Sequence, residues 1–174
     1  WGLDVYETRI DDLIGLDATW TPQNIEQARI RGAELTGAIT LAGWDIAAQA
    51  SHTDPRNRTD GANDGNLLPR RARNSARLDV DRAFGALLGP GRAFGDLRLG
   101  LTASGASHRY DNAANSVRLG GYGTLDLRLA WALTSRWTLE ARASNVFDRR
   151  YETIAWYDQP GREYGLSVRY AARD

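Results

Sequence analysis

Apolar and polar residues alternate along most of this chain with a period of two. Within Leu125–Trp131 every second residue is leucine or tryptophan, and Asp126 and Arg128 lie between them. The same alternation recurs over Leu97–Thr102 and Trp137–Ser144. A β-strand sends successive side chains to opposite faces, so this pattern sorts the charges onto one face, whereas a helix would scatter them around its surface. The pattern therefore predicts strands.

The chain contains about eight such segments, each long enough to cross a bilayer at a tilt. We predict them at residues 3–14, 25–42, 44–54, 70–84, 93–110, 121–132, 137–147 and 162–170. The connections alternate in length: 42–43, 85–92 and 133–136 are short, whereas 55–69, 111–120 and 148–161 are long and rich in Asp, Asn, Gly, Arg and Pro. This alternation predicts an all-β fold, an antiparallel transmembrane β-barrel segment of about eight meandering strands with short turns at one rim.

Aromatic residues mark the rim of the short turns. Trp44, Phe84, Trp131 and Trp137 each flank a short connection, and Tyr170 ends the last predicted strand. All five fall on the apolar face by parity. Aromatic rings at one height on a lipid-facing surface form an interfacial girdle, so we predict one at this rim, in contact with outer-membrane lipid.

Composition narrows the class of protein. The 174 residues carry 22 Lys+Arg and 22 Asp+Glu, and this balance gives no electrostatic reason to expect nucleic acid as a partner. There is no cysteine, which excludes disulfides and thiolate chemistry. No run of eighteen apolar residues exists, so no transmembrane helix is expected. The chain starts at Trp1 without Met, and we expect it to be part of a longer precursor.

No catalytic, metal or cofactor site emerges from the residues. The segment 60–65 looks like a calcium loop, but its position-three ligand is missing and Arg71 stands where a glutamate is required. His52 and His108 are isolated, and the Asp79–Asp81 pair is explained as charge on a lumen-facing strand. We therefore expect a protein that is not an enzyme and holds no cofactor.

Two groups of residues are candidates for ligand binding. Arg70 and Arg71 begin a basic cluster at the end of a long connection, which is either an anion site or a rim facing acidic headgroups. Trp156 and Tyr157 lie in the last long connection. They either stack on a flat ligand or pack the loop against its neighbours.

Several segments resemble TonB-dependent outer-membrane receptors of bacteria. Residues 143–153 (ASNVFDRRYET) are similar to the penultimate-strand motif of that family, N-[LV]-F-D-[KR]-x-Y, and residues 161–170 (GREYGLSVRY) resemble its closing strand. Residues 28–34 (ARIRGAE) and 67–73 (LLPRRAR) resemble earlier strands in the family's order. Within the family, Tyr157 together with residues 151–153 and 161–164 is most similar to the receptors for cobalamin.

The resemblance implies a barrel of about twenty-two strands that is plugged by an N-terminal domain. This chain would supply the C-terminal barrel portion over residues 1–170, followed by a short tail at 171–174. The implied function is active uptake of a scarce, bulky small-molecule ligand, cobalamin first and a siderophore or haem otherwise. TonB would bind through an N-terminal segment outside this chain.

The resemblance also implies a signal for the barrel-assembly machinery in the last strand, formed by Glu163, Gly165, Val168 and Tyr170.

The alternative to an uptake receptor is a small closed eight-stranded barrel with a structural or adhesion role, whose interior would be filled with side chains.

Overall fold

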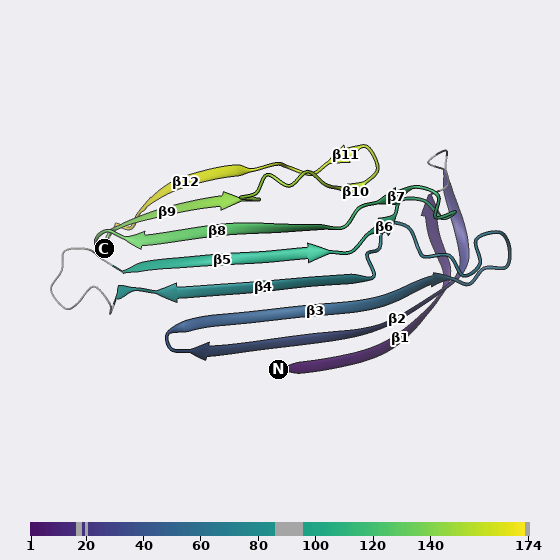
Figure 1. The fold of residues 1–174 in the computed structure, drawn as a ribbon, viewed down its shortest axis with the longest axis horizontal. Coiled ribbons are helices and arrows are strands. Elements are labelled where there is room, and N and C mark those ends of the chain that lie inside the picture. Colours follow the sequence, from purple (N-terminus) through teal and green to yellow (C-terminus); the bar gives the residue numbers. More distant parts are fainter. Residues whose placement is uncertain (17–18, 20, 86–95, 173–174) are drawn as a thin grey trace.

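The computed structural model describes residues 1–16, 19, 21–85 and 96–172. Its main element is one antiparallel sheet with the strand order β1-β2-β3-β4-β5-β8-β9-β12 (Figure 1). The fold is all-β, and the predicted meander is confirmed. Its eight strands are β1 (Gly2–Leu16), β2 (Pro22–Leu41), β3 (Trp44–Asn57), β4 (Asn74–Ala83), β5 (Leu97–Ala106), β8 (Tyr122–Ala132), β9 (Trp137–Ser144) and β12 (Glu163–Tyr170).

Two short hairpins lie in the long connections, where we predicted none. β6 (Arg109–Tyr110) pairs with β7 (Arg118–Leu119), and β10 (Glu152–Ile154) pairs with β11 (Tyr157–Asp158). The predicted strand at 93–110 was therefore too long, because the main-sheet strand ends at residue 106 and residues 109–110 belong to a separate sheet.

Left-handed backbone conformations explain two further boundary errors. β9 ends at residue 144 rather than 147, because Asn145 and Asp148 have φ angles of 48° and 52°. β4 begins at residue 74 rather than 70, because Arg70, with a φ of 61°, lies in a turn. Non-glycine residues rarely adopt positive φ, and at these positions the regular strand is interrupted. Of the predicted connection 85–92, only Gly85 belongs to the described residues.

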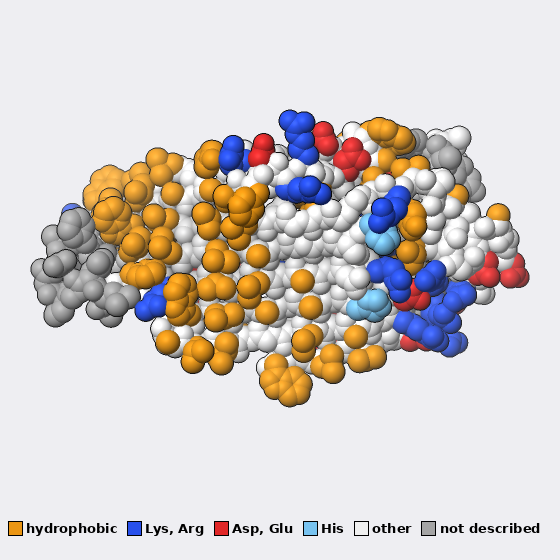
Figure 2. Space-filling model, in the orientation of Figure 1, with side chains coloured by type: hydrophobic (Ala, Val, Ile, Leu, Met, Phe, Trp, Pro, Cys, Tyr) orange, Lys and Arg blue, Asp and Glu red, His pale blue; other side chains and the backbone are white. Residues whose placement is uncertain are grey.

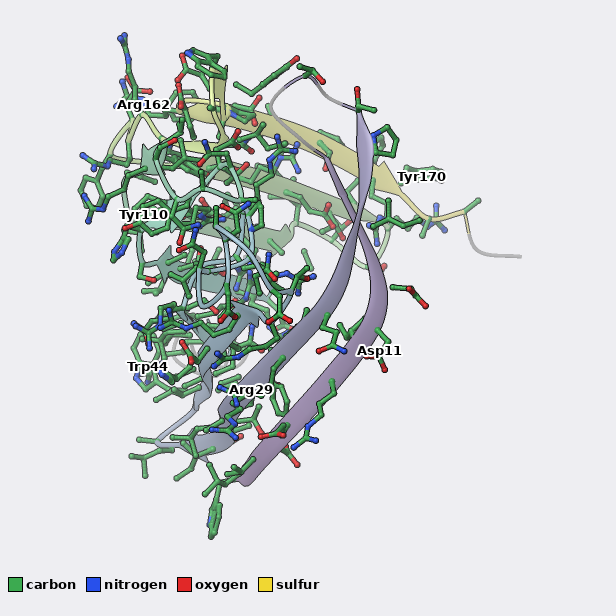
Figure 3. All side chains as sticks on the ribbon, turned by 90° about the vertical axis from the view of Figure 1, so that its right-hand side faces the viewer. Asp11, Arg29, Trp44, Tyr110, Arg162 and Tyr170 are labelled. Carbon is green, nitrogen blue, oxygen red and sulfur yellow. The ribbon has the colours of Figure 1, made fainter. Side chains whose placement is uncertain are left out.

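The two faces of the sheet differ in chemistry. Leu129 lies opposite Leu99 and Ala141 on one face, whereas Arg128 lies opposite Gly100 and Arg142 on the other. The sheet is strongly curved, with β1 and β12 at the two ends of the arc (Figure 3). Apolar side chains cover much of the face shown in Figure 2, which is the convex one. The concave face carries the charges predicted for the lumen side.

The convex face is not covered by any other part of the described chain. Ile39 is 58% exposed and Leu166 is 73% exposed. The buried apolar residues instead lie under the long connections or at the long-connection end of β2; they are Ala28, Leu67, Leu68, Leu119 and Ala155. An apolar surface of this extent requires an apolar neighbour. In the described parts of the chain, no helix is long and apolar enough to cross a membrane.

The sheet is open at both edges. Within the described residues, β1 pairs only with β2, and β12 pairs only with β9. The alternative of a closed eight-stranded barrel is therefore not what the structure shows. Unpaired backbone groups in lipid cost several kcal/mol each, so both edges need further strands in a membrane.

Candidate ligand-binding site

Three connections meet at the long-connection rim around one carboxylate. Arg70 Nε and Nη2 donate to Asp111 Oδ1 and Oδ2 at 2.9 and 3.4 Å, and the backbone N–H of Ala155 donates to Oδ1 at 3.1 Å. The N–H of Arg70 also donates to the Tyr110 carbonyl at 2.6 Å. Asp111 thus ties the connection before β4 and the β10–β11 hairpin to the β6–β7 hairpin.

Asn115 makes a second tie between the β6–β7 hairpin and the connection before β4. Its Oδ1 accepts from the backbone N–H of Leu67 at 2.9 Å, and its Nδ2 donates to the Leu67 carbonyl at 2.9 Å. Asn66 Nδ2 donates to the Ala113 carbonyl at 3.0 Å. Leu67 and Leu68 are buried beneath these bonds. A polar network with buried apolar support holds the rim in one arrangement.

Trp156 and Tyr157 lie at the tip of the β10–β11 hairpin. Ala155, immediately before them, is buried and bonded to Asp111, and Trp156 has a φ of 64° in the tight turn. The side chains of Trp156 and Tyr157 nevertheless stay 78% and 61% exposed. The backbone at the tip of this hairpin is held by Asp111, whereas both rings are exposed to solvent. Their role in binding a ligand stays a prediction, although this exposure does not favour the loop-packing alternative.

The two predicted arginines differ in their surroundings. The guanidinium of Arg70 is engaged by Asp111, which gives it a role in holding the rim together. Arg71 is exposed and makes no ion pair within the described residues. Of the two, Arg71 is therefore the more available to an anionic ligand, and neither assignment has been tested.

A buried arginine nearby was missed by the sequence analysis. Arg109 is 8% exposed, and its Nε and Nη2 have no hydrogen-bond partner within the part of the chain that the structure describes. Its guanidinium lies 5.5 Å from the ring of Tyr122, which in turn stacks on Tyr151 at 3.9 Å. Burial raises the pKa of the Tyr151 hydroxyl, with Tyr122 and Asp126 adding to the effect and Arg109 opposing it. The alternation of apolar and polar residues in the sequence does not distinguish Arg109 from an ordinary strand residue.

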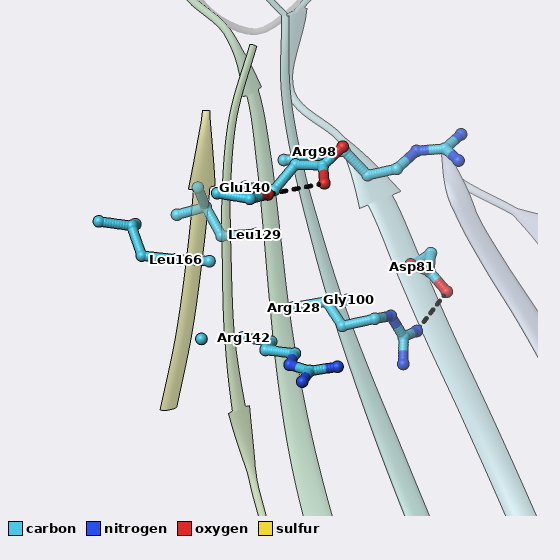
Figure 4. Close-up of a pocket in the computed structure, with 12 residues that line it drawn as sticks. Asp81, Arg98, Gly100, Arg128, Leu129, Glu140, Arg142 and Leu166 are labelled. Carbon is cyan, nitrogen blue, oxygen red and sulfur yellow. Dashed lines mark hydrogen bonds and ion pairs between the residues drawn. The ribbon is translucent and has the colours of Figure 1, made fainter. Parts of the chain in front are cut away.

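Below this rim, the concave face carries an ion-pair network. Arg77 Nε lies 2.7 Å from Asp79, Arg128 Nη2 lies 3.0 Å from Asp81, and the hydroxyl of Thr102 donates to Asp79 at 2.6 Å. Figure 4 shows Arg128 reaching Asp81 across the strand that carries Gly100. The aspartate pair is thus neutralised by arginines, as expected for lumen charges.

Glycine makes room for these long side chains. A Cβ at Gly100 would lie 2.3 Å from Asp81 Oδ1 and 2.9 Å from Arg128 Nη2. A Cβ at Gly165 would lie 2.8 Å from Arg142 Nε. The hollow between these residues, of about 540 Å³, is lined by charged residues of β4, β5, β8 and β9 and by small and apolar residues that include Gly165 and Leu166 of β12 (Figure 4).

The predicted girdle residues lie at the opposite rim. Trp44 meets Phe84 edge-on at 6.5 Å between ring centroids, and Trp137 lies 4.8 Å from Tyr170. Trp131 is opposite residue 97 at the start of β5. All five are beside the short connections, and their contact with lipid headgroups stays a prediction.

The predicted assembly signal is divided between the two faces of β12. By register with β9, Glu163 and Gly165 lie on the concave face, and Val168 and Tyr170 lie on the convex face. Recognition by the assembly machinery stays a prediction. No group of three or more potential metal-ligating His, Asp or Glu side chains exists among the described residues.

The model of the TonB-dependent receptor-like β-barrel family matches residues 1–146. The chain belongs to this family. Its members are transport receptors rather than enzymes, and they lie in the outer membrane of Gram-negative bacteria, which places this chain there.

Solved structures of similar fold match 97% of this chain. They include the ferric preacinetobactin receptor BauA of Acinetobacter baumannii (22% identity, TM-score 0.78, 26% of its length). The ferric yersiniabactin uptake receptor FyuA of Yersinia pestis is similar as well (22%, TM-score 0.77, 27% of its length). A third is the ferripyoverdine receptor of Pseudomonas aeruginosa (20%, TM-score 0.72, 24% of its length). The chain therefore spans about a quarter of the length of these proteins.

Proposed function

We propose that this chain is the C-terminal barrel wall, over residues 1–170, of an uptake receptor that binds a bulky ligand at its outer loops. The observation that carries the proposal is the rim held by Asp111, at which Trp156 and Tyr157 are exposed. Rigid aromatic side chains supply large contact area at low entropic cost. We place residues 171–174 after the wall as a short tail, of which 173 and 174 lie outside the described residues.

The ligand that we propose first is a ferric siderophore. The similar structures described above are siderophore receptors, and a ferric chelate is a large group rich in acidic oxygen atoms. Arg71 offers such a ligand an exposed guanidinium, whereas Arg109 is buried beside Tyr122. Guanidinium groups bind oxygen anions through charge-assisted hydrogen bonds.

Cobalamin is the second candidate. It is favoured by Tyr157 and by residues 151–153 and 161–164, which resemble the cobalamin receptors of the family. The similar structures named above do not add to that support. Both ligands are compatible with an aromatic contact at Trp156 and Tyr157.

Energy for uptake would come from TonB, through a segment that we place outside this chain. The short-turn rim would face the periplasm and the long connections the outside, as in other barrels of this type. Glu163, Gly165, Val168 and Tyr170 would be recognised during assembly, and the convex face would contact lipid.

Direct binding to the full-length receptor tests the proposal. Affinity is measured for a panel of ferric siderophores and for cobalamin, with the parent protein and with Trp156→Ala and Tyr157→Ala. We expect at least a tenfold loss for the true ligand in each variant. Tyr164→Ala, which removes an equally exposed ring from the convex face of β12, is the matched control and should bind normally.

Tyr157→Phe separates the modes of contact. Stacking predicts normal affinity in this variant, and a hydrogen bond through the hydroxyl predicts a loss. No binding of any panel member by the folded parent receptor would contradict the proposed ligand classes. Unchanged affinity in both alanine variants would contradict the assignment of these two rings.

A further inference from the structure

The convex face changes character along β1, β2 and β3. Near the middle of the sheet, Leu3, Leu35 and Ala50 are aligned across the three strands. Four residues further toward the long connections, the aligned set is Glu7, Arg31 and Asp54, and the next set on the same face is Arg9, Arg29 and Arg56. All of these sets lie on the same convex face, because the register is continuous and successive sets are separated by an even number of residues. An apolar surface is therefore followed by a charged one.

Arginines outnumber acids in this charged zone. We call it the outer arginine patch, and it consists of Arg9, Arg29, Arg31, Arg56 and Arg73, with Glu7 and Asp54 among them. Figure 2 shows basic side chains gathered beside the apolar area, at the end of the long connections.

Each acidic residue in the patch forms ion pairs with two arginines. Glu7 pairs with Arg9 and Arg31, and Asp54 pairs with Arg56 at 2.8 Å and Arg73 at 3.4 Å. Arg29 makes no ion pair within the described residues. Arg29 Nε and Arg73 Nε are shielded from solvent and have no hydrogen-bond partner among the described residues. Two carboxylates cannot neutralise five guanidinium groups, so the patch retains a net positive charge.

The height of the patch can be measured from the girdle. On β3, Asp54 is ten residues from Trp44, which lies at the short-turn rim. At a rise of about 3.3 Å per residue and a tilt of about 40°, ten residues correspond to about 25 Å along the membrane normal. The apolar band of such barrels is about 25 Å tall. The patch therefore begins where the hydrocarbon ends and the headgroups of the outer leaflet begin.

We propose that the outer arginine patch binds the phosphate groups of anionic lipid headgroups in the outer leaflet. Guanidinium groups bind phosphate through paired, charge-assisted hydrogen bonds, and several on one rigid surface act together. The transported ligand is not the occupant, because the patch is on the face turned away from the concave wall. The inference rests on the orientation in the membrane that is part of the proposed function, and it assigns a lipid partner to residues that ligand binding does not use.

Lipid binding by the full-length receptor in neutral detergent tests this inference. The probes are lipid A with its phosphates, the same lipid after enzymatic dephosphorylation, and inorganic phosphate. The variant is the triple substitution Arg29→Gln, Arg31→Gln and Arg56→Gln. A matched control removes the same charge from exposed connections through Arg118→Gln, Arg149→Gln and Arg150→Gln.

We expect the parent and the control to prefer phosphorylated lipid A, and the patch variant to bind it at least tenfold more weakly. Dephosphorylated lipid should bind all three proteins weakly, and inorganic phosphate at equal concentration should not compete. Equal binding of phosphorylated lipid by the patch variant and the parent would overturn the inference. So would an equal loss in the control, or competition by inorganic phosphate, which would indicate a free-anion site.

Two further measurements keep the outcomes distinct. Heat-modifiable migration on gels establishes that the patch variant is folded, so that a loss of lipid binding is not a loss of the barrel. Siderophore or cobalamin affinity is measured on the same preparations and should be unchanged in the patch variant. A receptor that binds lipid A through the patch but none of these ligands would leave the inference standing while the proposed ligands fail.

Discussion

Leu127→Arg should destabilise the receptor strongly, because this position is near the middle of the membrane. Leu127 lies on the convex face opposite Leu101 and Ala143, and it is 42% exposed. It is four residues from Trp131 at the aromatic rim, or about 10 Å along the normal at a tilt of about 40°. The midplane of a band about 25 Å tall is about 12 Å from that rim.

An arginine near the midplane of such a barrel costs about 2–4 kcal/mol, and near the interface about 0–1 kcal/mol. Leu129 is two residues from Trp131 and only about 5 Å from the rim, so Leu129→Arg should cost less than Leu127→Arg. A loss of about 2 kcal/mol lowers the ratio of folded to unfolded protein about thirty-fold. The two leucine positions thus predict which substitution costs more stability as well as how large the cost is.

Arg128→Leu is the matched control on the concave face. It removes the ion pair with Asp81 and places a leucine where water has access. Because the Arg128 side chain is 41% exposed, this pair is worth about 1 kcal/mol or less after solvent screening. The Arg128→Leu variant should therefore be less damaged than Leu127→Arg.

The stabilities of these variants are compared by equilibrium unfolding of the full-length receptor from lipid vesicles. Heat-modifiable migration on gels measures the fraction of folded barrel. Equal losses for Leu127→Arg and Arg128→Leu would show that the assignment of faces is wrong. A larger loss at Leu129 than at Leu127 would show that the depth scale, and with it the height of the arginine patch, is wrong.

Three further changes test the rim and the concave wall. Asp111→Ala removes the acceptor shared by Arg70 and Ala155, so we expect faster hydrogen exchange in the β10–β11 hairpin and weaker ligand binding, with no change in the transmembrane strands. Gly165→Val should reduce the yield of folded receptor in the outer membrane, because a Cβ there would lie 2.8 Å from Arg142 Nε; a normal yield would mean that Arg142 moves aside at little cost. Arg109→Leu should leave siderophore affinity unchanged and the barrel folded, because this guanidinium is buried beside Tyr122; a tenfold loss of affinity would show that Arg109 reaches the ligand.

The alternation of side chains was enough to predict the faces of the sheet. Leu125–Trp131 and the charged residues between them lie on the faces that parity assigns, because the position of a strand residue is fixed by its backbone and by the period of two. The turn at residues 42–43 was also predicted, and Ala42 and Gly43 both adopt positive φ there.

The rim of long connections could not be predicted in the same way. Its arrangement depends on single contacts between residues far apart in the sequence, such as Asp111 with Arg70 and Asn115 with Leu67. No periodicity identifies such partners. The burial of Arg109 depends equally on where the β6–β7 hairpin lies over Tyr122, and the predicted continuous strand at 93–110 left no place for that hairpin.

The order of strands has a consequence for how the wall folds. Every pair in the main sheet joins strands that follow one another along the sheet order of the chain, and within the described residues the β6–β7 and β10–β11 hairpins are the only strands outside it. Contacts between strands that are close in the sequence cost little loop-closure entropy. This wall therefore has a low contact order and can fold hairpin by hairpin. In a barrel that contains it, only β12 would have to find a strand from a distant part of the polypeptide. That closing step, rather than formation of the wall, is where we expect the slow phase of folding and the greatest dependence on the assembly machinery.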